Sequence, residues 1–280
     1  AGNELTGDNL PETIYVQLQR KTESDSDWEP VDVTDQNYVE VKRDNGGWAH
    51  KFTNLDADDY TSTANPRPVY QYRVVEGVLK NDEFVAKNPG TDAFLLSDGY
   101  TYTYEDGVME STTANGKTSN TITLTNKRLN PKFNLDITKK DAEDGTTLLK
   151  DVEFKLEKMK VDESGKLVVD SKFNTLIGVT NDKGVLMLKD SVGNETQGFK
   201  DLKAGKYRLT ETKAAENYNL LSAPIEVEFT KTGECRLNDS EIKVSTEENH
   251  TDFTKNGNDS YTLKLTVLNR KTPALPHTGA

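Results

Sequence analysis

Residues 133–139, Phe-Asn-Leu-Asp-Ile-Thr-Lys, carry an apolar side chain at every second position until a lysine takes the next one. Successive side chains of a β-strand point to opposite faces, so the apolar residues share one face and Lys139 lies on it with them. The stretch therefore predicts a strand whose inner face carries an amine. Leaving that amine unpaired in a core is costly, so a polar partner is expected nearby.

The same period of two recurs along most of the chain, for example in residues 14–19, 152–157 and 225–229. Sequences typical of tight turns separate such runs, among them Asp-Glu-Ser-Gly at 162–165 and Asn-Asp-Lys-Gly at 181–184. No window shows a helical period longer than a turn or two. The pattern predicts an all-β protein built of β-sandwiches, in which half of each strand faces a core.

Composition limits the classes of partner. The 280 residues have room for about two domains. A net charge of −12 disfavours nucleic acid and anionic membranes, because both attract basic surfaces. Cys235 is the single cysteine, so an internal disulfide is excluded. The chain holds no run of about 20 apolar residues and opens on a polar stretch, so we expect a trimmed ectodomain fragment with no membrane segment.

The two halves of the chain resemble each other. Residues 72–76, Tyr-Arg-Val-Val-Glu, parallel residues 207–211, Tyr-Arg-Leu-Thr-Glu, and residues 121–127 parallel residues 264–270. This similarity indicates a diverged internal duplication. A short polar stretch with a proline, residues 127–131, marks the boundary. The predicted domains are residues 1–128 and 129–272, followed by a tail at 273–280.

Strand parity places three polar residues on the core face of the second domain: Lys139, Glu211 and Asn269. Burial favours the neutral forms, lowering the pKa of the amine and raising that of the carboxyl group. A neutral Lys139 is a nucleophile, and a protonated Glu211 can polarise the Asn269 carbonyl and pass protons to departing ammonia. The predicted product is a Lys139–Asn269 isopeptide bond. The alternative is a Lys–Glu ion pair with Asn269 capping a strand end.

A family resemblance rests on the same residues. Residues 137–141 followed by 151–156 look like the first two strands of a CnaB-type domain, and residues 207–214 resemble the E-box of that family. The resemblance implies immunoglobulin-like sandwiches, a Lys139–Asn269 cross-link and Glu211 as the catalytic acid. It also implies a stalk or pilus subunit of a Gram-positive surface. One departure is that the E-box usually continues into Pro-x-Gly-Tyr, whereas residues 215–218 read Ala-Glu-Asn-Tyr.

The first half resembles a longer CnaB-type module through residues 10–18 and 47–55. Glu76 and Asn126 take the places of the catalytic acid and the cross-linked asparagine. The strand with the reactive lysine is missing, and the resemblance places it upstream of Ala1. The first domain is therefore expected to lack its first strand. The alternatives are that another lysine, such as Lys51, replaces it or that no bond forms.

The chain ends with Leu275, Pro276, His277, Thr278 and Gly279 before the final alanine, and this pentapeptide resembles the sorting signal cut by sortases. Pro276 favours extended geometry, which suits an enzyme groove. The bond after Thr278 would be cut, and an amine of peptidoglycan or of a neighbouring pilus subunit would then attack the Thr278 carbonyl. The alternative is an ordinary Pro/Gly-rich tail.

These features together predict a structural protein of the cell-wall-anchored surface, with sortase as a partner. Catalysis is expected only on the chain itself, with no cofactor. A metal site is not expected, because His50, His250 and His277 are scattered. The alternative function is a ligand-binding adhesin module whose first domain recognises a host matrix protein or glycan. That function predicts a concave apolar patch around Trp28, Trp48 and residues 80–98.

Overall fold

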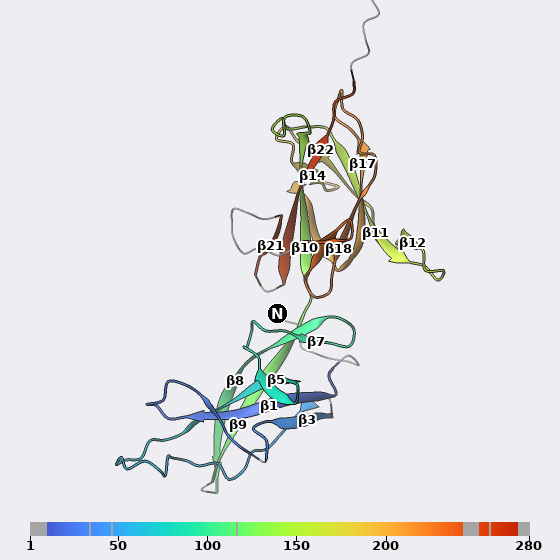
Figure 1. Cartoon of the computed structure of the whole chain (residues 1–280). Coiled ribbons are helices and arrows are strands. Elements are labelled where there is room, and N and C mark those ends of the chain that lie inside the picture. Colours follow the sequence, from blue (N-terminus) through green and yellow to red (C-terminus); the bar gives the residue numbers. More distant parts are fainter. Residues whose placement is uncertain are drawn as a thin grey trace, which may run out of the picture. The chain divides into compact units, whose positions relative to one another are not determined.

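The computed structural model describes residues 10–33, 35–45, 47–115, 117–242, 252–257 and 259–273. Across these residues the regular structure consists of strands alone, which confirms the prediction of an all-β protein with tandem β-sandwiches. No helix in the described part of the chain is long and apolar enough to cross a membrane. The chain divides into two compact units, Ala1–Leu129 and Asn130–Ala280 (Figure 1).

Unit 1 consists of two sheets. The first has the order β4-β3-β1-β5-β6, with β2 paired to β1, and the second has the order β7-β8-β9. The strands of unit 1 are β1 (Thr13–Lys21), β2 (Glu29–Pro30), β3 (Val39–Asp44), β4 (Gly47–Trp48), β5 (Gln71–Lys80), β6 (Glu83–Ala86), β7 (Phe94–Leu95), β8 (Thr101–Ala114) and β9 (Lys117–Leu129). β8 and β9 form a long antiparallel hairpin, and β9 lies at the edge of its sheet.

Unit 2 also consists of two sheets. One has the order β16-β10-β22-β21, and the other runs β15-β14-β13-β11-β17-β18-β19-β20, with β12 paired to β11. The strands of the first sheet are β16 (Phe199–Lys203), β10 (Lys132–Asp141), β22 (Ser260–Asn269) and β21 (Phe253–Lys255). The strands of the second are β11 (Glu153–Val161), β12 (Leu167–Val169), β13 (Leu176–Thr180), β14 (Leu186–Lys189), β15 (Glu195–Gln197), β17 (Gly205–Lys213), β18 (Ile225–Phe229), β19 (Cys235–Leu237) and β20 (Ser240–Ile242). The first strand, β10, pairs in parallel with the last, β22, over ten residues.

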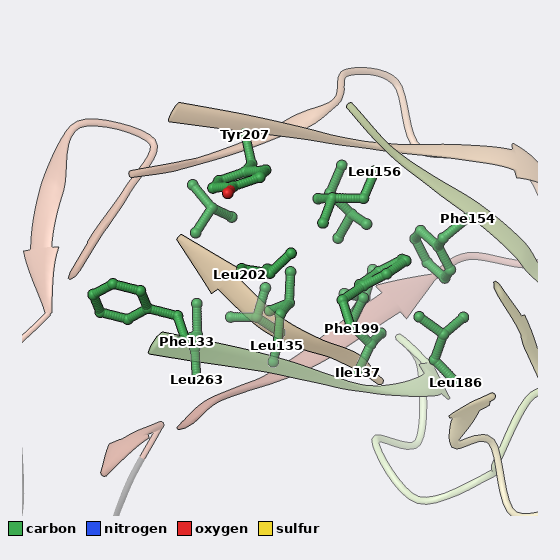
Figure 2. Close-up of a cluster of buried hydrophobic side chains, with 14 of the residues drawn as sticks. Phe133, Leu135, Ile137, Phe154, Leu156, Leu186, Phe199, Leu202, Tyr207 and Leu263 are labelled. Carbon is green, nitrogen blue, oxygen red and sulfur yellow. The ribbon is translucent and has the colours of Figure 1, made fainter. Parts of the chain in front are cut away.

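The core of unit 2 lies between its two sheets. Buried and partly exposed residues alternate along β10, so that every odd position from Phe133 to Asp141 faces inward. Figure 2 shows Phe133, Leu135 and Ile137 of β10 pointing toward side chains of the facing sheet, including Tyr207. The phenyl ring of Phe133 stacks on that of Phe229 at 4.4 Å between ring centroids. Unit 1 has instead two small apolar clusters, one around Tyr104 and one around Val16.

The two units share their strand relationships. In unit 1 β1 lies between β3 and β5, as β11 lies between β13 and β17 in unit 2. The β8–β9 pair of unit 1 corresponds to the antiparallel β21–β22 pair of unit 2. The difference is at the last strand. β22 has β10 on its other side, whereas no described strand pairs with the corresponding side of β9. The backbone donors and acceptors along that edge therefore have no partner strand within the described ranges.

Candidate functional site

Lys139, Glu211 and Asn269 meet inside unit 2 and are only 0%, 5% and 2% exposed, respectively. The Lys139 Nζ donates a hydrogen bond to Asn269 Oδ1 at 2.5 Å, and Asn269 Nδ2 donates to Glu211 Oε1, also at 2.5 Å. The Lys139 Nζ also lies 3.9 Å from Glu211 Oε2. The amide of Asn269 therefore lies between an amine and a carboxyl group, and all three side chains are buried.

The strand framework explains how residues so distant in sequence meet. Parallel pairing of β10 with β22 sets Lys139 opposite Val267 and Asp141 opposite Asn269, so the lysine and the asparagine lie on the same face of one sheet. Glu211 comes from β17 of the facing sheet. The backbone of Lys139 is also fixed by the loop at Gly184, because the Lys139 N–H donates to the Gly184 carbonyl at 2.7 Å. The site thus joins both sheets of the sandwich.

Burial controls the protonation of the site. Removal from water lowers the pKa of the Lys139 amine to about 8, against the opposing attraction of the Glu211 carboxylate. Burial likewise raises the pKa of Glu211, against opposing effects of the Asn269 hydrogen bond and the Lys139 charge. Both shifts favour the uncharged forms, a free amine and a protonated acid. These are the forms in which one group can act as nucleophile and the other as proton donor.

The contacts define which atom each group addresses. Asn269 Oδ1 is bonded directly to Cγ, so the Lys139 amine lies beside the electrophilic carbon. Glu211 contacts the amide nitrogen, the group that would leave as ammonia, whereas the sequence-based expectation was a contact with the carbonyl oxygen. The structure therefore places the Glu211 carboxyl group at the amide nitrogen of Asn269 and not at its carbonyl oxygen.

Sequence reasoning gave no role to Asp141, the residue that follows Lys139 on the inner face of β10. Its carboxylate is fully buried and accepts hydrogen bonds from the Tyr218 hydroxyl at 2.8 Å and from the backbone N–H of Glu143 at 2.7 Å. Lys271 Nζ lies 3.1 Å from Asp141 Oδ2. These hydrogen bonds and the nearby charge lower the pKa of Asp141. The odd position of Asp141 on the strand was the signal that placed it inward.

The chain that follows Glu211 is tied to the chain that follows Asn269. The N–H of Asn219 donates to the carbonyl of Arg270 at 3.0 Å, and that of Thr272 donates to the carbonyl of Asn217 at 2.8 Å. The N–H of Leu221 reaches Glu211 Oε2 at 3.3 Å. The turn in which the sequence departs from the expected Pro-x-Gly-Tyr thus closes the end of the site.

Unit 1 contains an incomplete counterpart. Glu76 on β5 is fully buried and accepts a hydrogen bond from the Tyr102 hydroxyl at 2.7 Å. The pKa of Glu76 is raised, because burial outweighs the opposing effects of the neighbouring Tyr102 and Asn126 side chains. Among the described residues, Glu76 Oε2 and Asn126 Oδ1 find no hydrogen-bond partner. Lys51 is exposed and lines a different cavity, so the structure does not bring it to these residues.

The remaining predicted residues are dispersed. The cationic groups of Lys21 and Arg73 lie 5.2 and 4.7 Å, respectively, from the centroid of the Trp28 ring. Trp48 lines a groove that includes neither Trp28 nor any residue of 80–98. Residues 275–279, the sorting-signal pentapeptide, lie outside the described residues, as do His250 and His277. No group of three His, Cys, Asp or Glu residues suited to a metal ion occurs within the part of the chain that the structure describes.

Comparison with known proteins gives one family match. The family model described as SpaA, a prealbumin-like fold domain, matches residues 133–242, a range that contains Lys139 and Glu211. No curated protein sequence matches the chain. The family match and the strand topology agree on a prealbumin-like sandwich for unit 2.

Several solved structures are similar to the chain. A C-terminal fragment of the pilus adhesin SpaC from Lactobacillus rhamnosus GG is 17% identical, with 93% of this chain and 90% of that chain covered and a TM-score of 0.33. The pilus 2b backbone protein of group B streptococcus is 17% identical, with coverages of 97% and 90% and a TM-score of 0.31. The TIE protein of Bacillus anthracis is 18% identical with a TM-score of 0.33. The match covers 92% of this chain and 31% of the TIE protein.

Proposed function

We propose that this chain is a structural segment of a Gram-positive pilus or wall-anchored surface stalk, and that unit 2 closes itself with an isopeptide bond between Lys139 and Asn269. The observation that carries the proposal is the buried contact of the Lys139 amine with the Asn269 amide, whose nitrogen donates to Glu211. An ordinary ion pair would not need an asparagine between its partners. The arrangement instead supplies a nucleophile, an electrophile and an acid.

The reaction balances without any cofactor. The neutral Nζ of Lys139 attacks Cγ of Asn269, and a new C–N bond forms as the carbonyl oxygen takes up negative charge. Glu211 donates its proton to the amide nitrogen and recovers one from the attacking amine. The C–N bond to that nitrogen then breaks, so one secondary amide and one ammonia replace the amine and the primary amide. Fixed proximity can lower the barrier by about 7–11 kcal/mol. The chain thus acts as a catalyst only on itself.

The position of the bond explains its mechanical use. β10 and β22 are the first and last strands of unit 2 and run parallel, so tension enters at the start of one and leaves at the end of the other. A bond between Lys139 and Asn269 would pass that tension from β10 directly to the residue where β22 ends. The chain between the two residues would carry none of it. Such a bond suits a segment that transmits tension between the cell wall and a distal binding region.

Attachment to the surface follows from residues 275–279. In the proposed role a sortase cuts after Thr278 and passes the Thr278 carbonyl to an amine of peptidoglycan or of a neighbouring pilus subunit. The protein is then extracellular and wall-anchored. Incubation with a sortase and a short glycine peptide tests this part, because the expected product ends at Thr278 with the peptide attached. A chain with Thr278→Ala should give no product, and equal product from both chains would contradict the assignment.

Intact mass under denaturing conditions tests the bond itself. The chain should weigh one ammonia less than its sequence, and Glu211→Ala should restore the full mass. Glu228→Ala is the matched control, because Glu228 on the adjacent strand β18 makes only surface ion pairs with Lys206 and Arg236. An unaltered mass in the parent chain would reduce the three residues to a buried polar cluster. A deficit of two ammonia would mean that unit 1 has also found an amine.

A further inference from the structure

Two of the three reacting residues of unit 2 lie where strands end. Asn269 is the last residue of β22, and Glu211 is followed by only two more residues of β17. Strand ends open more readily than strand centres, because fewer contacts hold them. The reaction needs its groups in fixed positions, and a misplacement of about 1 Å can slow such a step by about 100-fold. A contact that fastens both strand ends would therefore control the rate.

Asp141 makes contacts of this kind. It lies opposite Asn269 in the parallel pairing of β10 with β22. Its carboxylate accepts a hydrogen bond from the Tyr218 hydroxyl at 2.8 Å, and the Lys271 Nζ lies 3.1 Å from its Oδ2. Tyr218 belongs to the turn that follows Glu211, and Lys271 comes two residues after Asn269. One carboxylate thus joins the end of β10 to the chain that follows the other two reacting residues.

Burial explains why these contacts are required. The Asp141 side chain is only 1% exposed, and a buried charge is costly unless it is paired and hydrogen-bonded. The backbone N–H of Glu143 supplies one partner from the turn that follows β10. The other two partners come from the segments that follow Glu211 and Asn269. The carboxylate therefore has all its partners only when both segments are in place.

The pair formed by Asp141 and Lys271 stays charged. The pKa of Asp141 is lowered, chiefly by the hydrogen bond from the Glu143 backbone, and the pKa of Lys271 is raised, chiefly by its contact with Asp141. A protonated amine is not a nucleophile, so this pair holds the segments together without reacting. Burial shifts the pKa values of Lys139 and Glu211 in the opposite directions, toward the neutral forms that can react.

We propose that Asp141 is a positioning residue for the bond in unit 2: by holding the turn after Glu211 and the chain after Asn269, it aligns the acid and the amide with the amine before the bond forms. The inference rests on the proposed function, because it concerns the same reaction. Among the described residues the Asp141 carboxylate bonds to Glu143, Tyr218 and Lys271 and not to the reacting side chains. It acts through the segments that carry them.

The rate of bond formation in newly made chain tests this role. The whole chain is pulse-labelled in a cell-free extract, quenched in denaturant at intervals and weighed, so that the fraction lighter by one ammonia gives the rate. Asp141→Ala should form the bond about 100-fold more slowly than the parent. Asp141→Asn keeps a hydrogen-bond acceptor but lacks the charge, so its rate should be intermediate.

Asp144→Ala is the matched control. Asp144 is exposed in the turn that follows β10, and its carboxylate accepts hydrogen bonds from Thr146 and Thr147 of that same turn. Its loss should weaken the turn without releasing the chain after Glu211 or Asn269. The bond should therefore form at the rate of the parent.

Double substitutions show whether the partners act through Asp141. Tyr218→Phe and Lys271→Met should each slow the bond by about tenfold, the equilibrium equivalent of one hydrogen bond to a charged group. In Asp141→Ala neither should have a further effect, because the contact that each one removes is already absent. Equal slowing in both backgrounds would overturn the proposal.

Protection of Cys235 separates positioning from folding. Cys235 is buried in β19, so its resistance to a thiol reagent, relative to the denatured chain, reports that unit 2 has folded. In Asp141→Ala this protection should appear at the rate of the parent, well before the bond. A delay in protection as long as the delay in the bond would reduce Asp141 to a folding role and overturn the proposal.

The parent chain separates this proposal from the proposed function. A parent that loses one ammonia at the same rate as Asp141→Ala would overturn the positioning role and leave the isopeptide bond standing. Slowing by Asp144→Ala equal to that by Asp141→Ala would also overturn it, because the turn alone would then be responsible. A parent that loses no ammonia would overturn both.

Discussion

The Nζ of Lys139 lies 2.5 Å from Oδ1 of Asn269, although 130 positions of sequence separate the two residues. The first and last strands of unit 2 bring them together, and the facing sheet adds Glu211 to the pair. A covalent bond at this point would close nearly the whole of unit 2 into one loop. The mechanical and thermodynamic consequences follow from that closure.

Pulling on the ends of the chain should distinguish the bonded and unbonded forms of unit 2. In Glu211→Ala the chain from Lys139 to Asn269, which are 130 positions apart, can extend by up to about 450 Å, at roughly 3.3–3.6 Å per residue. In the parent chain the bond should prevent this segment from extending, so an atomic force microscope should record no such gain in length when unit 2 is pulled. A parent record with the same extension would show that no covalent bond is present.

Unfolding in urea should show the stability that the bond provides. Closing a loop of this length restricts the unfolded chain and is expected to stabilise unit 2 by about 5 kcal/mol, by analogy with a disulfide. Glu211→Gln keeps the size of the side chain but lacks the acid, so its free energy of unfolding should fall by about that amount. Glu228→Gln, at a surface ion pair, should change stability by less than about 1 kcal/mol. Equal losses in both variants would contradict the prediction.

The rate of bond formation should depend on pH as a bell-shaped curve. The reactive state holds one proton on the pair, on Glu211, with Lys139 neutral. As pH falls below the raised pKa of Glu211, both groups are protonated and the amine is lost as a nucleophile. As pH rises above about 8, the pKa of Lys139, the pair loses its last proton and the acid is gone.

Two halves of the chain, divided between Ser164 and Gly165 in an exposed turn, provide the assay. Mixing them at each pH would join Lys139 of one half to Asn269 of the other, and denaturing gels would show the joined product over time. A rate that rises continuously with pH would mean that Glu211 does not act as an acid.

Gly184→Ala should disturb the site through the backbone of Lys139. A Cβ at Gly184 would lie 2.7 Å from the Lys139 carbonyl oxygen, and the residue has a positive φ of 66°. Gly165→Ala is the control, since its φ is 82° but nothing lies within 4 Å of the added carbon. Both should lose about 1–2 kcal/mol from backbone strain. Only Gly184→Ala should lose more and form the bond more slowly, as measured by urea unfolding and by mass. Equal losses would contradict the close contact.

Cys235 should report opening of unit 2. It is fully buried, and burial raises the pKa of its thiol to about 12, so the folded chain should resist thiol reagents at pH 8. In Glu211→Gln transient opening becomes more frequent, so labelling should accelerate, and denaturation should expose the thiol in both chains. Rapid labelling of the folded parent would show that β19 opens without loss of the bond.

The sequence was sufficient for the features that depend on local alternation. The period of two in residues 133–139 predicted strands and an all-β sandwich, and the structure contains both. It also assigned Lys139, Glu211 and Asn269 to inner faces, where the structure buries them. Odd and even positions predict the inner and outer faces of a strand, because side chains alternate along any strand whatever its neighbours are.

Side-chain alternation did not predict contacts between segments that are distant in sequence. Alternation did not reveal that Glu211 would touch the amide nitrogen instead of the carbonyl, because a face does not define which atoms meet. The contacts of Asp141 with Tyr218 and Lys271 depend on a turn and a strand end that sequence pattern does not place. The sequence places Trp48 only in a predicted apolar patch with Trp28, and the structure puts it beside Glu76 and Asn126 in one groove.

The sequence by itself thus determined the strands, their inward faces and the chemical groups on those faces. Tertiary structure decided which groups meet: a complete set of amine, amide and acid in unit 2, and an amide and an acid without an amine among the described residues of unit 1. The physical reason is that alternation is a local property of an extended backbone. The pairing of β10 with β22, and the free edge of β9, depend on which strands come together across a long loop.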